Sequence, residues 1–414
     1  MQKPDTIEIM APAGSFAALQ AAIQAGADSV YFGIEKLNMR SRSSKNFTIE
    51  DLKKIVEITR DKGVKSYLTL NTVIYDEDID LMQKIVDAAQ DSGVTAIIAS
   101  DLAVMQYAQQ KNVEIHMSTQ ANISNIEAVR FYSQFADVVV LARELNLKQI
   151  QKITKQIKDN KITGPSGKLI QVEIFAHGAL CMAISGKCYL SLHQYNHSAN
   201  RGDCLQACRR SYIVTDRDTG QELEIDNENI MSPKDLCTIH FLNKILDAGV
   251  SVLKLEGRAR SPEYVKTVTE CYKEAAQAYF EGTYTEEKIE NWRAHLKTVF
   301  NRGFWDGYYL GQKLGEWTHK YGSQATQKKV FVGPVTNYFS NIQVGEFYSE
   351  ANSLEKGDEL LIIGPTTGVV ELTLGEVRID DQDVERVPQN VEFSIPVNTK
   401  LRRSDKLYKL IKKE

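Results

Sequence analysis

Short apolar runs alternate with amphipathic stretches along roughly the first 280 residues of the chain. Eight of the apolar runs have the length and β-rich composition of strands, and helical periodicity lies between them. This alternation is typical of successive βα units around a parallel sheet. Eight strands favour a closed barrel over an open doubly wound sheet. The expected strands are 7–11, 29–33, 66–71, 96–100, 114–118, 138–142, 171–175 and 251–255.

Glycines mark the ends of four expected helices. Gly26, Gly63, Gly93 and Gly249 each follow an apolar periodic segment and precede an expected strand. Glycine readily adopts the left-handed conformation that ends a helix, so each is placed as a C-terminal cap. Ser15 can cap the start of the first helix.

A long segment interrupts the pattern between the seventh and eighth strands. Residues 179–210 are rich in Cys, His, Asn and Gly and show no clear periodicity. Loops this long inside a compact domain are usually functional. Residues 211–230 then alternate like a hairpin around a turn at 218–220, and Ser232-Pro233 is expected to begin a helix.

The pattern changes after Gly282, first to a polar helical stretch and an aromatic connector, then to short β segments from Lys329 onward. We therefore expect an α/β fold with a (β/α)8 TIM-like barrel and a small C-terminal all-β barrel domain. The barrel is assigned to 1–282 with a cysteine-rich insertion at about 177–240, the connector to 283–328 and the β domain to 329–414.

Composition and charge narrow the class of protein. With 43% hydrophobic and 25% charged residues the chain resembles ordinary globular proteins, and 414 residues exceed the roughly 250 of a barrel. A net charge of -4 argues against a protein that coats nucleic acid with its whole surface. Residues 399–414 nevertheless hold seven Lys or Arg against two acids, which indicates either a solvated tail on an edge strand or an RNA contact.

The start of the chain shows no basic segment followed by a long apolar run, as a signal peptide would. No stretch approaches the roughly 18 apolar residues of a membrane span. We therefore expect a cytoplasmic protein without a membrane partner.

Four of the six cysteines fall within 28 residues. Disulfides are disfavoured in a cytosolic chain, and the spacings differ from the paired C-x2-C of common zinc sites. Thiolates from well-separated loop positions suit an iron–sulfur cluster, with zinc and plain buried thiols as alternatives. Cys271, in a helical stretch, is interpreted as core packing. The remaining five are Cys181, Cys188, Cys204, Cys208 and Cys237.

Several longer motifs carry a resemblance to a known family. EIFAHGALC at 173–181, SGKCYLS at 185–191 and NRGDCLQACR at 200–209 resemble the signature of the collagenase-like peptidase family U32. MAPAGSFAALQAAIQAGADSVYFG, LNMRSRSSKNF, SPKDLC and LKLEGRARSPEYV also resemble that family, in the expected order. The resemblance covers nearly the whole barrel.

The resemblance implies an enzyme that uses a 4Fe-4S cluster, because better-understood members are oxygen-independent hydroxylases of RNA or quinone precursors. A barrel with one small β domain is similar to the prephenate-dependent tRNA hydroxylases, which make 5-hydroxyuridine at the wobble position. The implied partners are the tRNA anticodon loop and iron–sulfur assembly proteins, with prephenate as co-substrate. Ribosomal RNA or another small substrate is the alternative. The implied ligands are Cys181, Cys188, Cys204 and Cys237, with Cys208 as a substitute fourth.

Active sites of such barrels lie at the C-terminal ends of the strands. Glu173, His177 and Glu256 fall there and are candidates for proton transfer, although His177 could equally brace the cysteine loop through a backbone hydrogen bond. The two carboxylates of prephenate favour bidentate arginines. The candidate substrate-binding residues are Arg40, Arg42, Asn71, Gln120, Arg143, Arg201, Lys254 and Arg258.

Two other functions remain open. A peptidase would need an activated nucleophile, but the sequence has no H-E-x-x-H or G-x-S-x-G. A cysteine pairing with His177 or His193 would leave the grouping of five cysteines unexplained. A non-catalytic RNA-binding protein with a structural cluster would bind RNA without forming a product. If RNA is the substrate, we expect a base turned into the barrel mouth and phosphates held by the C-terminal domain.

Overall fold

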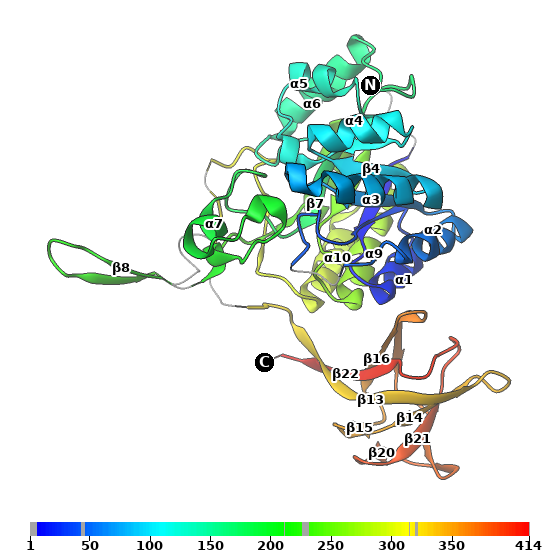
Figure 1. Cartoon of the computed structure of the whole chain (residues 1–414). Helices are drawn as coiled ribbons and strands as arrows, with labels where there is room; N and C mark the ends of the chain where they lie inside the picture. The colour runs from blue at the N-terminus through cyan, green and yellow to red at the C-terminus, as the bar shows by residue number, and fades with distance from the viewer. Residues whose placement is uncertain are drawn as a thin grey trace.

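The structure, a computed structural model, describes residues 6–42, 46–210, 212–225, 232–313, 315–318 and 322–413. The barrel and its helices form one body, and the antiparallel strands that follow residue 326 form a second one beside it (Figure 1).

Eight parallel strands close into a barrel. Each pairs with its neighbour in chain order, and the last one pairs with both the first and the seventh. This confirms the expected barrel, with strand ends within three residues of the expected ones. The strands are β1 (Glu8–Pro12), β2 (Ser29–Gly33), β3 (Lys65–Leu70), β4 (Ala96–Ala99), β5 (Ile115–Met117), β6 (Val138–Val140), β7 (Gln171–Gly178) and β11 (Val252–Leu255).

Helices cover the outside of the barrel (Figure 1). Ser15 caps the first one by accepting from the Ala18 amide, and the four expected cap glycines have φ between 68° and 82°. These end signals are confirmed. The helices are α1 (Phe16–Gln24), α2 (Asp51–Asp61), α3 (Ile79–Ser92), α4 (Leu102–Gln110), α5 (Ile126–Tyr132), α6 (Leu147–Asp159), α8 (Leu242–Asp247) and α9 (Pro262–Phe280), followed by α10 (Glu286–Thr298).

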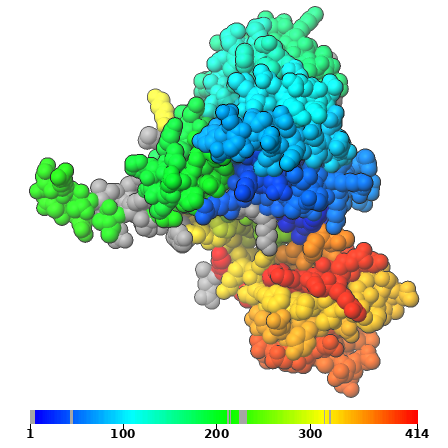
Figure 2. Space-filling model, in the orientation of Figure 1, coloured from blue at the N-terminus to red at the C-terminus, as the bar shows by residue number. Residues whose placement is uncertain are grey.

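The cysteine-rich segment lies against the barrel with little regular structure. It contains α7 (Leu190–Tyr195) and short 3-10 turns, η3 (Ala199–Arg201) and η4 (Ala207–Arg209). The expected hairpin is confirmed as β8 (Tyr212–Thr215) and β9 (Glu222–Ile225), which project away from the body of the molecule (Figures 1 and 2).

The helix expected to begin at Ser232-Pro233 was a wrong prediction. The chain instead forms β10 (Asp235–Cys237), which pairs with the extended end of β7 and with β12 (Phe304–Trp305). All three β10 residues are buried between these partners, so tertiary pairing overrides the local helix-start signal. The helix α8 starts only at Leu242, after the 3-10 turn η5 (Ile239–Phe241).

The C-terminal strands form an eight-stranded antiparallel sheet in the order β17-β16-β22-β13-β14-β21-β18-β19, and two short strands pair beside it. The all-β pattern expected after Lys329 is therefore present. The strands are β13 (Gln327–Phe339), β14 (Val344–Tyr348), β15 (Leu354–Glu355), β16 (Glu359–Gly364), β17 (Gly368–Thr373), β18 (Arg378–Ile379), β19 (Gln382–Asp383), β20 (Arg386–Val387), β21 (Glu392–Pro396) and β22 (Lys406–Lys412).

The basic segment at the end of the chain is neither a tail nor an edge strand. It forms β22, which lies between β16 and β13, with Leu407 buried in the core of the domain. The Lys409 ammonium pairs with Asp358 at 2.7 Å. At least this lysine of the basic segment is therefore paired within the C-terminal domain.

The second body packs on α1 and α9 of the barrel. Ala21 forms a small apolar cluster with Leu361 and Val369. The Gln24 amide donates to the Thr367 carbonyl at 2.8 Å and accepts from the Val369 amide at 2.9 Å. Among the described residues, no helix is both long enough and apolar enough to cross a bilayer.

Candidate active site at the barrel mouth

A cavity of about 200 Å³ lies between the C-terminal ends of the barrel strands and the cysteine-rich segment. Seven of the expected catalytic and substrate-binding residues line it, and each lies at a strand end or in the loop that follows one. They are Arg40, Asn71, Gln120, Arg143, Lys254, Glu256 and Arg258.

Glu256 is the acidic centre of this cavity. Its Oε1 accepts from Arg40 at 2.8 Å, and its Oε2 accepts from the Tyr31 hydroxyl at 3.1 Å. Burial alone would raise the pKa of Glu256, but the guanidinium groups of Arg40, Arg143 and Arg258 lower it to about 2. Glu256 is therefore a carboxylate at neutral pH and orients its cationic neighbours rather than donating a proton.

Arg258 is fixed by its surroundings. Its Nη1 donates to the Thr69 hydroxyl at 2.8 Å and to Asn38 Oδ1 at 3.1 Å. Burial lowers its pKa to about 10, so it remains a cation at neutral pH. The backbone beneath it is equally constrained, because a Cβ at Gly14 would lie 1.8 Å from the Arg258 carbonyl oxygen.

Four buried side-chain atoms at the cavity, on Thr119, Gln120, Arg143 and Asn200, have no hydrogen-bond partner among the described residues. Arg143 stacks on Phe175, with 4.1 Å from Cζ to the ring centroid, and its Nη1 donates to the Ala179 carbonyl at 3.4 Å. Its buried Nε and the buried Gln120 Oε1 have no hydrogen-bond partner in the part of the chain that the structure describes. Unpaired buried donors and acceptors are costly, so this region suits a polar ligand.

Lys254 and Glu173 form a buried pair at the base of the cavity. The Lys254 ammonium lies 2.7 Å from Glu173 Oε1, and the two side chains are 7% and 0% exposed. Lys254 lines the cavity, whereas Glu173 lies behind it.

His177 lies outside the cavity, among the rings of Tyr264, Tyr272 and Phe304. Burial, together with the nearby Arg260, lowers its pKa to about 3. The imidazole is therefore neutral at neutral pH, and it does not line the cavity. Its backbone carbonyl accepts from the Glu256 amide at 2.9 Å, so its visible role is to hold the strand ends together.

Arg42 and Arg201 also lie outside the cavity. Arg201 pairs with Asp78 at 2.7 Å and stacks on the Tyr75 ring at 3.8 Å, which ties the cysteine-rich segment to the start of α3. Arg42 contacts His197 at 3.2 Å on the surface. Both arginines attach the segment to the barrel.

The cysteines divide into two groups. Cys181, Cys188, Cys204 and Cys208 line the same cavity, whereas Cys237 is buried on β10 outside it. Burial raises the pKa of both Cys237 and Cys208 to about 11, so position and not thiol acidity separates them. The family resemblance implied Cys237 as the fourth ligand and Cys208 as its substitute, whereas the geometry groups Cys208 with the other three cysteines and places Cys237 apart. As expected, Cys271 packs in the hydrophobic core.

The four cysteines that line the cavity match the ligands of an iron–sulfur cluster and not those of a single metal ion. In the described ranges, no group of three or more His, Cys, Asp or Glu side chains could hold a single metal ion. Each cysteine of a four-iron cluster binds a different iron, so the ligands surround an object larger than one ion. Four thiols around one cavity, with cationic side chains beside them to offset thiolate charge, fit such a cluster in chemistry and number.

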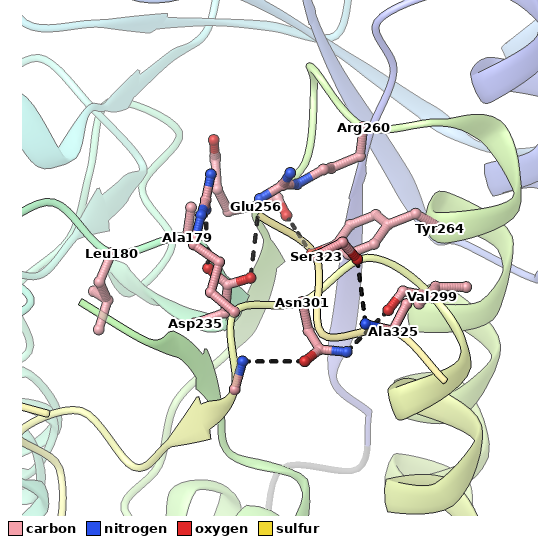
Figure 3. A network of polar contacts seen from close by, with 12 residues as sticks. Ala179, Leu180, Asp235, Glu256, Arg260, Tyr264, Val299, Asn301, Ser323 and Ala325 are labelled. Atoms are coloured by element: carbon pink, nitrogen blue, oxygen red, sulfur yellow. Dashed lines mark hydrogen bonds and ion pairs between the residues drawn. The ribbon is translucent and has the colours of Figure 1, made fainter. Parts of the chain in front are cut away.

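A second group of arginines was missed by the sequence analysis. Arg302 and Arg260 converge on buried Asp235, at 3.3 and 3.9 Å. Figure 3 shows Asp235 and Arg260 near Glu256. Arg209 donates to the Leu180 carbonyl at 3.0 Å and so holds the chain next to Cys181. Arg209 ends the NRGDCLQACR motif and Arg260 lies within the LKLEGRARSPEYV motif, whereas Arg302 lies in neither. The three arginines extend the cationic lining of the cavity.

Comparison with known proteins decides the family. The model of peptidase family U32 matches residues 14–319, which include the barrel from α1 onward, the cysteine-rich segment and all residues that line the cavity. The chain belongs to peptidase family U32.

Relatives within this family carry different names. A protein named collagenase from Porphyromonas gingivalis is 63% identical over 407 residues, 98% of either chain. A tRNA hydroxylation protein of Bacillus subtilis is 33% identical over 401 residues, 94% of this chain and 92% of the other. A 23S rRNA 5-hydroxycytidine synthase of Escherichia coli is 34% identical over 317 residues, 75% of this chain and 46% of its own length. The family is shared, but the named activities differ.

Proposed function

We propose that this U32 protein is a tRNA hydroxylase that forms 5-hydroxyuridine at the wobble position, with prephenate as co-substrate and a 4Fe-4S cluster as cofactor. The observation that carries the proposal is the meeting of four cysteines and an arginine-lined cavity at the barrel mouth. Relatives named for tRNA hydroxylation and rRNA hydroxycytidine synthesis support the reaction class.

The cluster would be held by Cys181, Cys188, Cys204 and Cys208. When bound, it would supply an electron-transfer or Lewis-acid centre beside the substrate. The fixed guanidinium groups of Arg143 and Arg258 would bind the two carboxylates of prephenate, because planar donors suit carboxylates. Glu256 keeps Arg40 oriented toward the same space.

The surface of the cysteine-rich segment would receive the RNA. Its residues 178–210 contain four Lys or Arg and one acid, in contrast to the net negative chain. Tyr189 and Tyr195 are exposed there, and Arg210 lies over the Tyr195 ring at 4.8 Å. Exposed aromatic rings among cations are typical of surfaces that stack single-stranded bases. This surface borders the cavity, whereas β22 lies within a sheet.

A peptidase is the second candidate because of the relative named collagenase. A cysteine peptidase needs a histidine in reach of the reactive thiol. Among the described residues that line the cavity there is no histidine, and Cys271, which lies 3.7 Å from His295, is buried in the core. The cavity therefore favours the hydroxylase.

The test combines cofactor and product analysis. We expect protein purified without oxygen to be brown and to contain iron and sulfide. We also expect tRNA from a deletion strain to lack 5-hydroxyuridine until the wild-type gene is restored, whereas Arg143→Leu should restore little. Colourless protein with unchanged nucleosides, together with collagen cleavage, would establish the peptidase instead.

A further inference from the structure

The buried pair of Lys254 and Glu173 is unusual for a barrel interior. Removing two charges from water costs several kcal/mol per ion in general, and only good pairing offsets it. Here one carboxylate oxygen is paired, but Glu173 Oε2 is buried without a hydrogen-bond partner among the described residues. The strands that carry the pair, β11 and β7, are already joined by backbone pairing. Holding those strands together therefore does not require this pair.

The surroundings of Lys254 are those of a reactive amine. Its ammonium lies 4.7 Å from the Tyr31 ring centroid and 5.7 Å from that of Phe175, and its side chain reaches the cavity. Arg143 lies over the same Phe175 ring, and Arg258 lies 5.9 Å from the same Tyr31 ring. The Lys254 amine therefore shares one aromatic ring with Arg143 and another with Arg258.

We propose that Lys254 forms an imine with the carbonyl group of a 2-oxo acid bound in this cavity. Such an acid carries a carboxylate directly beside its carbonyl carbon. A site that forms an imine with it therefore needs a cation to bind the carboxylate and an amine next to that cation to reach the carbonyl carbon. Arg143 or Arg258 supplies the cation, and Lys254 supplies the amine. This inference deepens the proposed function and rests on it for the natural ligand, because prephenate contains a 2-oxo acid side chain.

Glu173 provides the proton transfers. A proton moves from the Lys254 ammonium to Glu173 along the 2.7 Å hydrogen bond, which leaves a free amine and a neutral acid. The amine nitrogen attacks the carbonyl carbon and forms a C–N bond. One proton from the amine nitrogen and the proton held by Glu173 move to the former carbonyl oxygen, which leaves as water. A protonated imine then remains on Lys254, and Glu173 is again a carboxylate. No oxidant or reductant is required.

Borohydride trapping on the wild-type protein tests this proposal. The protein is incubated with prephenate, phenylpyruvate or pyruvate, reduced with borohydride, digested and mapped by mass spectrometry. We expect the Lys254 peptide to gain the mass of the acid less one oxygen, only when both acid and borohydride are present. Lys329, which pairs with Glu263 at 2.7 Å outside the cavity, is the internal control and should stay unmodified.

Two variants separate charge from nucleophilicity. Lys254→Arg keeps the positive charge beside Glu173 but has no primary amine, so no adduct should form at that position. Glu173→Gln keeps the shape of the side chain but cannot take up or release a proton, so the adduct should form about a hundredfold more slowly. Thermal melts of both variants report folding, and the wild-type mapping does not depend on either of them.

The possible outcomes are distinct. An unmodified Lys254 in wild-type protein that hydroxylates tRNA would overturn the imine and leave the proposed function standing. Equal labelling of Lys254 and Lys329 would also overturn it, as non-specific chemistry. Labelling of Lys254 alone, in a protein that yields no 5-hydroxyuridine, would support the imine and refute the tRNA reaction.

Discussion

Acid should destabilise this protein through His177. The imidazole is 2% exposed among aromatic rings, and burial with the nearby Arg260 lowers its pKa from 6.5 to about 3. In the unfolded chain the same group titrates near its ordinary value. Between these two pH values the unfolded chain therefore binds one proton more than the folded protein, and the free energy of unfolding falls as the pH falls.

The size of the effect follows from the displacement of the pKa. Above about pH 6.5, His177 has almost no effect on the free energy of unfolding. The loss in that free energy reaches about 1.4 kcal/mol near pH 5.5 and about 2.7 kcal/mol near pH 4.5. It stops growing only below the folded pKa of about 3.

The assay compares urea unfolding of the wild-type protein and His177→Asn across this range. The variant keeps a polar side chain near the Tyr272 hydroxyl, which lies 3.4 Å from His177 Nδ1, but it has no group that titrates there. All other titrating groups are shared, so the difference between the two free energies isolates the imidazole. If that difference stays constant from about pH 7.5 to 4.5, the argument from burial is refuted.

Three further predictions concern the cysteines, the barrel loop and the domain contact. Cys208→Ser should lose most iron and sulfide while Cys237→Ser keeps them, because of these two cysteines only Cys208 lines the cavity. Loss of iron from Cys237→Ser alone would contradict the assignment of Cys208 to the cluster. Gly14→Ala should lower the free energy of unfolding, measured in urea, by about 1–3 kcal/mol, because its methyl group would clash with the Arg258 carbonyl oxygen. Unchanged stability would show that the loop moves to relieve the clash. Gln24→Ala should lower the free energy of unfolding by about 1–3 kcal/mol, because it leaves the Thr367 carbonyl and the Val369 amide unpaired. It should also speed proteolysis between the two bodies, and cleavage at the wild-type rate would count against this contact.

The barrel was predictable because its signals are local. A strand-length apolar run and a cap glycine each lie within a dozen residues, and they agree along the chain. The interpretation of the β22 segment as a solvated tail on an edge strand was wrong because its lysines suggest solvent, although Leu407 between them is buried. Sequence could not show that β10 would pair with two distant strands, because that choice depends on tertiary contacts.

The site was predictable by residue type and position, but not by partner. Arg40 and Glu256 are 216 residues apart, and nothing local indicates that they meet at 2.8 Å. The separation of Cys237 from the other thiols depends on β10, which the sequence analysis expected to be the start of a helix. For His177 the sequence left proton transfer and a bracing backbone hydrogen bond open, and only its position among aromatic rings favours the bracing role.

The position of β22 also affects biosynthesis. This strand follows every other strand of its sheet in the chain, yet it lies between β13 and β16. While a ribosome is still extending the chain, β13 and β16 each present an unpaired edge, and such edges recruit other chains. The sheet is completed only when Lys406–Lys412 emerges. A nascent or prematurely terminated product would therefore carry a finished barrel joined to an aggregation-prone half-sheet, a natural substrate for chaperones and proteases.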